Sequence, residues 1–133
     1  MYKRQNKHLE AYYILSNLEH TIPAFRFSLR ISILRCLLSL SIQKSEYLTS
    51  FNSRIEASRK WVEKQQPSPQ IQNFVDFRKV LVKLAKYLKP ISRKQSLLTQ
   101  AKKIVESNPN ILLKNILVEK MEEIQNVFPP EKH

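Results

Sequence analysis

The residues of this chain that offer the clearest chemistry are lysines, and they gather in residues 71–103. Lys79, Lys83 and Lys86 are four and three residues apart, a spacing that places their ammonium groups on one face of a helix. Such a line of positive charge can follow a row of phosphates, because each lysine that neutralises a phosphate releases a bound counterion. No acidic residue lies within residues 77–105 to offset these charges.

Other basic residues extend this candidate surface beyond Pro90, where the first basic helix is expected to end. The charges converge only if the helices on the two sides of Pro90 pack side by side with their lysines facing the same way. On that condition we expect an anionic partner, either nucleic acid or an acidic protein surface. The candidate binding residues are Lys79, Lys83, Lys86, Arg93, Lys94, Lys102 and Lys103.

Trp61 is the only tryptophan, and it lies between Lys60 and Lys64. An aromatic ring flanked by cations can stack on a nucleic-acid base or against a lipid headgroup. The alternative is that the indole closes the end of the hydrophobic core. We therefore retain Trp61 as a candidate stacking residue beside this structural interpretation.

Catalytic and metal-binding patterns are poor in comparison. None of the histidines has a second histidine or cysteine at helical ligand spacing, so a metal site lacks ligands. Cys36, the only cysteine, lies in an apolar run and is expected to be a buried, inert thiol. Three glutamates on an outward helix face are expected to be solvated. We therefore predict no enzymatic activity, no cofactor and no metal. The histidines are His8, His20 and His133, and the three glutamates are Glu119, Glu122 and Glu123.

The composition of the 133-residue chain restricts its class further. The chain contains no glycine, which excludes the glycine-rich loops of nucleotide-binding proteins and disfavours hairpin turns. Its net charge of +12 favours anionic partners, although a merely solubilising role would give the same charge. The single cysteine, with neither a signal peptide nor a long uncharged apolar run, predicts a cytoplasmic protein without a transmembrane segment.

The elements that must position the lysines are predicted to be helices, because apolar residues recur at spacings of three and four along most of the chain. We expect an all-α bundle of about five helices joined by Pro, Asn and Ser connectors, with no sheet. A capping box formed by Ser92 and Gln95 is expected to open the second basic helix. The expected helices cover residues 6–20, 24–42 continuing through 43–66, 71–89, 92–107 and 109–128.

The stretch Ala24–Ile42 is the one place where two secondary structures compete. Phe25 to Ile33 alternates apolar and polar residues, which is the period of a strand. A strand here has no turn to return it and no partner elsewhere, so a helix at the centre of the bundle is favoured. A missing domain or a partner could dock on the Ala24–Ile42 side.

The Pro-containing connector Gln65–Gln70 divides the chain into a hydrophobic helical half, residues 6–66, and a basic helical half, residues 71–128. We interpret the two halves as one domain. Residues 1–5, Met-Tyr-Lys-Arg-Gln, resemble the translation of a sequencing adapter, which predicts a non-native start and a C-terminal fragment of a longer protein.

Two hypotheses for function follow. The first is a non-enzymatic basic helical interaction module with an anionic partner. The alternative is a structural fragment of a helical bundle that docks onto a protein partner or onto a missing N-terminal domain. A helix-turn-helix around Asn108–Asn110 is disfavoured, because Ile111, Leu112 and Leu113 would occupy the recognition positions. No motif identifies a family.

Overall fold

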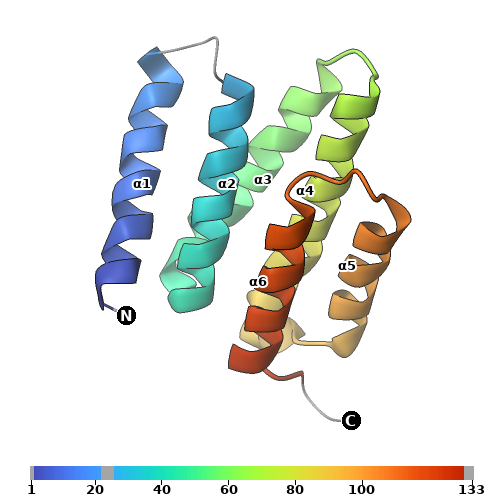
Figure 1. The fold of residues 1–133 in the computed structure, drawn as a ribbon. Coiled ribbons are helices and arrows are strands. Elements are labelled where there is room, and N and C mark those ends of the chain that lie inside the picture. The colour runs from blue at the N-terminus through green and yellow to red at the C-terminus, as the bar shows by residue number, and fades with distance from the viewer. Residues whose placement is uncertain (1, 22–25, 131–133) are drawn as a thin grey trace. The chain divides into compact units, whose positions relative to one another are not determined.

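The computed structural model describes residues 2–21 and 26–130, and every regular element in these two ranges is helical (Figure 1). The predicted all-α fold is confirmed. The α-helices are α1 (Tyr2–Thr21), α2 (Arg26–Gln43), α3 (Leu48–Glu63), α4 (Pro69–Leu88), α5 (Gln95–Ser107) and α6 (Lys114–Val127). Two short 3-10 helices join them, η2 (Ser45–Tyr47) and η3 (Pro90–Ser92).

The chain forms two compact units, Met1–Arg54 and Ile55–His133. The boundary falls inside α3, so the first turns of that helix belong to the first unit and the remainder to the second. The connector predicted at Gln65–Gln70 lies within the second unit, where it joins α3 to α4.

In the first unit, α1 and α2 pack side by side (Figure 1). The stretch that alternates like a strand is helix α2 from Arg26 onward, so the helix prediction is confirmed there; Ala24 and Phe25 lie outside the described residues. Buried residues recur along α2 at helical spacing, with Ile33, Leu37 and Leu40 almost fully inaccessible. The pattern of burial, rather than the local alternation, therefore decides the structure.

The helix predicted to continue from residue 42 to residue 66 is interrupted. Lys44 adopts an extended backbone, with φ −144° and ψ 126°, and the chain turns through η2 before α3 begins at Leu48. This break accounts for six α-helices in the described ranges where about five were expected.

In the second unit, α4 supplies more of the core than any other helix. Its start follows from local chemistry: the Ser68 side chain accepts a hydrogen bond from the Ile71 amide at 3.1 Å, and Pro69 occupies the first turn. Phe74 and Phe77 are fully buried, and each such side chain contributes roughly 1.5–3 kcal/mol on removal from water. Arg78 fastens α4 to the middle of α3 by donating from Nε to the Ile55 carbonyl at 3.1 Å.

Two of the predicted helix starts are wrong. Helix α5 begins at Gln95 with Lys94, rather than Ser92, in the capping position. Helix α6 begins at Lys114 rather than at residue 109, after a loop that ends with Leu113 in the left-handed region at φ 52° and ψ 40°.

Asn108 organises the loop that replaces the predicted helix start. Its side-chain amide donates to Asn73 Oδ1 at 3.0 Å and to Asp76 Oδ2 at 2.7 Å, and its Oδ1 accepts from the Asn110 amide at 3.0 Å. These contacts tie the end of α5 to the first half of α4. They also fix the side-by-side packing of α4 and α5 at the end of the helix pair remote from Pro90.

Candidate anion-binding surface

Lys79, Lys83 and Lys86 lie on one side of α4, and we refer to them as the lysine face. The opposite side of α4 carries its buried residues, among them Phe77 and Leu84. Lys79 and Lys86 are exposed and Lys83 is half-buried. Among the described residues, no carboxylate forms an ion pair with any lysine of this face.

The turn between α4 and α5 brings further lysines to the end of this face. Pro90 cannot continue α4, and the Lys89 amide donates to the Lys86 carbonyl at 3.2 Å as the helix ends. Because α5 then returns beside α4, Lys94 and Lys86 line the same depression. A hollow of about 380 Å³ results, which we call the lysine hollow. It is lined by Lys86, Lys89, Ile91, Lys94, Ser96 and Leu97, with no acidic residue among them.

Arg93 has a different role from its neighbouring lysines. Its guanidinium carbon lies 4.1 Å from the centre of the Phe128 ring, and Nη2 donates to the Leu88 carbonyl at 3.4 Å. The side chain is half-buried. These contacts hold the turn against the end of α6, so Arg93 positions the lysine hollow rather than lining it.

Tyr87 lies beneath the same junction and strengthens it. Its hydroxyl donates to the Phe128 carbonyl, and the ring is completely buried. Burial raises the pKa of the Tyr87 phenol above its ordinary value, with Arg93 opposing the rise. The end of α4 and the end of α6 are therefore joined by both a hydrogen bond and the arginine–aromatic contact.

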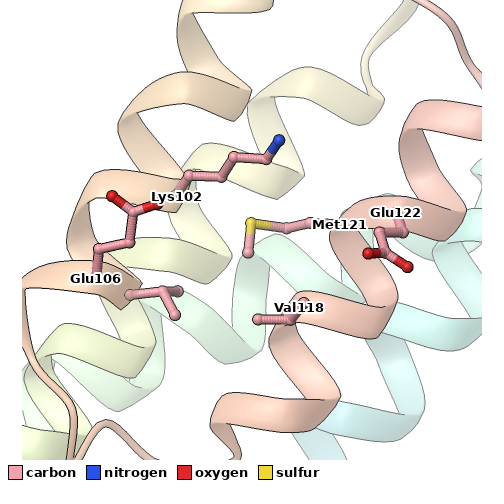
Figure 2. Close-up of a pocket in the computed structure, with 6 residues that line it drawn as sticks. Lys102, Glu106, Val118, Met121 and Glu122 are labelled. Atoms are coloured by element: carbon pink, nitrogen blue, oxygen red, sulfur yellow. The ribbon is translucent and has the colours of Figure 1, made fainter.

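Lys102 belongs to another part of the surface. It lines a groove of about 240 Å³ between α5 and α6, together with Val105, Glu106, Val118, Met121 and Glu122 (Figure 2). Lys102 and Glu106 approach this groove from α5, whereas Val118, Met121 and Glu122 approach it from α6 (Figure 2). Its two carboxylates offset the charge of Lys102, so this groove is not a continuation of the lysine hollow.

Lys103 is exposed on the side of α5 opposite its buried residues Leu98, Ala101 and Val105. It therefore lines neither the lysine hollow nor the α5–α6 groove. Of the sequence-predicted site residues, the structure brings together Lys79, Lys83, Lys86 and Lys94, and sets Arg93, Lys102 and Lys103 apart.

Trp61 is half-buried in the second unit. Its ring meets Phe74 edge-on, with 5.6 Å between centroids and an interplanar angle of 81°. This contact agrees with the interpretation that the indole closes the end of a core. The stacking role of Trp61 stays a prediction.

Four residues of the hollow were not among the candidates: Lys89, Ile91, Ser96 and Leu97. Lys89 is part of the acid-free run, but it lies beside Pro90, where the helix is expected to end. Helical spacing therefore does not predict on which face Lys89 lies. Ile91 carried a recognisable signal: it is the one large apolar residue in the turn Pro90–Lys94, where neither neighbouring helix can bury it. An isolated hydrophobic residue in a turn is therefore informative here.

Within the described ranges, no group of three or more His, Cys, Asp or Glu side chains is placed to hold a metal ion. No helix in the same ranges is both long enough and apolar enough to cross a bilayer. Burial raises the pKa of the Cys36 thiol, with Arg35 opposing the rise, which favours the unreactive protonated form.

The chain matches no protein-family model, and no curated protein or solved structure shows significant similarity to it.

Proposed function

We propose that this chain is a non-enzymatic interaction module that binds an anionic partner through the lysine face and the lysine hollow. The observation that carries the proposal is the hollow itself, where Lys86, Lys89 and Lys94 surround a concave surface without an acidic neighbour among the lining residues. Three lysines line one hollow, so their positive charges add together there and favour an anionic ligand.

The lysine face extends the proposed binding surface from the hollow along α4. Like charges four residues apart on a helix destabilise it by roughly 0.2–0.5 kcal/mol, so the pair Lys79 and Lys83 has a small cost in the free protein. A partner with a row of negative charges would convert this cost into attraction. The face leads directly into the hollow through Lys86, which belongs to both.

Heparin labelled with a fluorophore provides a general polyanionic probe, and binding is followed by fluorescence anisotropy over a range of salt concentrations. We expect binding at low salt that weakens steeply as salt rises, because association releases counterions. Replacing Lys79, Lys83 and Lys86 together by glutamate should abolish this binding.

A matched control separates the surface from the net charge. Lys7, Lys44 and Lys114 are exposed residues outside the lysine face and away from Trp61, and their replacement by glutamate changes the net charge equally. This control variant should retain much tighter heparin binding than the variant of the lysine face. Equal losses in the two variants, or no binding by the native chain at low salt, would contradict the proposed function.

A further inference from the structure

Ile91 is the most exposed large hydrophobic residue among those described, with 93% of its surface accessible. A single exposed apolar side chain is ordinary on a protein surface. Ile91 differs because it shares the lysine hollow with Lys86, Lys89 and Lys94. An apolar side chain that lines the same hollow as three lysines combines hydrophobic and electrostatic attraction, which few partners satisfy together.

The backbone fixes this exposure. Ile91 is the middle residue of η3, whose first residue, Pro90, has a ring that restricts its own backbone. On one side of the turn, the Lys89 amide is bound to the Lys86 carbonyl, and on the other side Arg93 lies over the Phe128 ring. Both ends of the turn are therefore attached to helices, and Ile91 is held outward between them.

We propose that this turn contacts the surface of an anionic phospholipid membrane. Ile91 enters the boundary between headgroups and acyl chains, while Lys86, Lys89 and Lys94 lie against headgroup phosphates. The inference rests on the proposed function and names the partner. A peripheral contact of this kind needs an apolar side chain that reaches only about 5–10 Å into the interface and lysines that remain at its surface.

Other anionic partners use only part of this surface. The phosphate backbone of a nucleic acid would satisfy the lysines, but it offers no apolar environment in which Ile91 could leave water. An acidic protein would need an apolar socket surrounded by carboxylates. A phospholipid surface presents both components everywhere, with the apolar layer directly beneath the charged one.

The test is sedimentation of the full chain with vesicles made of phosphatidylcholine and phosphatidylserine in equal parts, and with vesicles of phosphatidylcholine alone. We expect the native chain to sediment with the first and not with the second. Ile91→Ser should weaken binding about tenfold or more, because the apolar surface that drives insertion is lost. Ile14→Ser is the matched control, since Ile14 is 58% exposed on α1, and it should bind like the native chain.

Two further variants separate insertion from charge. Replacing Lys86 or Lys94 by glutamine should weaken vesicle binding about fivefold for each lysine. Ile91→Trp should keep or increase affinity, and anionic vesicles should shift its emission to shorter wavelengths beyond any change of Trp61 in the native chain. Circular dichroism verifies that each variant is folded.

The outcomes distinguish this inference from the proposed function. If Ile91→Ser binds the anionic vesicles as tightly as the native chain while the lysine variants weaken, the membrane contact is wrong and anion binding stands. Tighter binding to a mixed-sequence DNA duplex than to the vesicles, unaffected by Ile91→Ser, would assign the surface to nucleic acid. A native chain that binds neither vesicles nor heparin contradicts both proposals.

Discussion

The guanidinium carbon of Arg93 lies 4.1 Å from the centre of the Phe128 ring, although these residues are distant in the sequence. The contact joins the α4–α5 turn to the end of α6, and it separates two adjacent cations by role. Arg93 holds the turn in place, whereas Lys94 is exposed in the lysine hollow. Adjacent residues of the same charge should therefore differ in what they contribute.

Exchanging each cation for glutamine measures this difference. Arg93→Gln should lower the free energy of unfolding by about 1 kcal/mol, since it removes the contact with Phe128. Lys94→Gln should change stability by less than about 0.5 kcal/mol and weaken heparin binding more than Arg93→Gln does. Urea unfolding followed by Trp61 fluorescence reports on the second unit, which contains the only tryptophan. The reverse pattern would assign Arg93 to the binding surface.

Tyr87 should make stability depend on alkaline pH. Its pKa is raised mainly by burial, so the folded state favours the neutral phenol. This contribution is complete below the pKa of an unfolded tyrosine, about 10, and is lost as pH rises through the folded pKa. Tyr87→Phe should cost about 1 kcal/mol at neutral pH, because the Phe128 carbonyl loses its donor, and the difference should shrink at alkaline pH.

The control for Tyr87 is Tyr13→Phe, at an exposed position on α1 in the first unit. Urea titrations at a series of pH values, read by Trp61 fluorescence, should show no comparable change for this variant. A constant difference between the native chain and Tyr87→Phe across the alkaline range would show that Tyr87 does not titrate in the unfolding reaction.

Cys36 should react slowly with thiol reagents. Its pKa is raised by burial, and only the thiolate form attacks a disulfide. We expect the second-order rate with an aromatic disulfide reagent at neutral pH to be about tenfold or more below that of glutathione. The rate should approach the glutathione value after denaturation in urea. Rapid reaction of the folded chain would instead identify an activated cysteine and challenge the non-enzymatic proposal.

Helical periodicity predicted the all-α fold, because the spacing of apolar residues directly reflects which face of each helix is buried. It could not predict where α5 begins. Ser92 and Gln95 have the spacing of a capping box. The backbone of this turn is instead determined by Pro90 and by the contact of Arg93 with Phe128. That contact joins residues far apart in the chain, and no local pattern contains it.

The candidate surface, like the fold, could be predicted from the sequence only in part. The line of Lys79, Lys83 and Lys86 follows from helix geometry alone, and α4 carries it as expected. The separation of Lys94 from Lys102 depends on which flank of α5 meets α6, and the sequence of α5 does not encode that choice by itself. The structure therefore divides a charge run that appears continuous in the sequence.

Asn108 provides the sharpest test of the packing that forms the lysine hollow, because it secures the other end of the α4–α5 pair. Asn108→Ala should lower the free energy of unfolding by about 1–3 kcal/mol, since the side chains of Asn73 and Asp76 lose a donor.

Asn108→Asp should be at least as destabilising as Asn108→Ala, although it nearly preserves the shape of the side chain. It keeps the acceptor for the Asn110 amide but replaces the amide donor with a carboxylate facing Asp76. The matched control is Asn115→Asp, at an exposed position in the first turn of α6, where a negative charge is neutral or slightly stabilising. Urea unfolding read by Trp61 fluorescence measures all three variants. If Asn108→Asp is as stable as the native chain, the Asn108 amide does not hold the α4–α5 pair together.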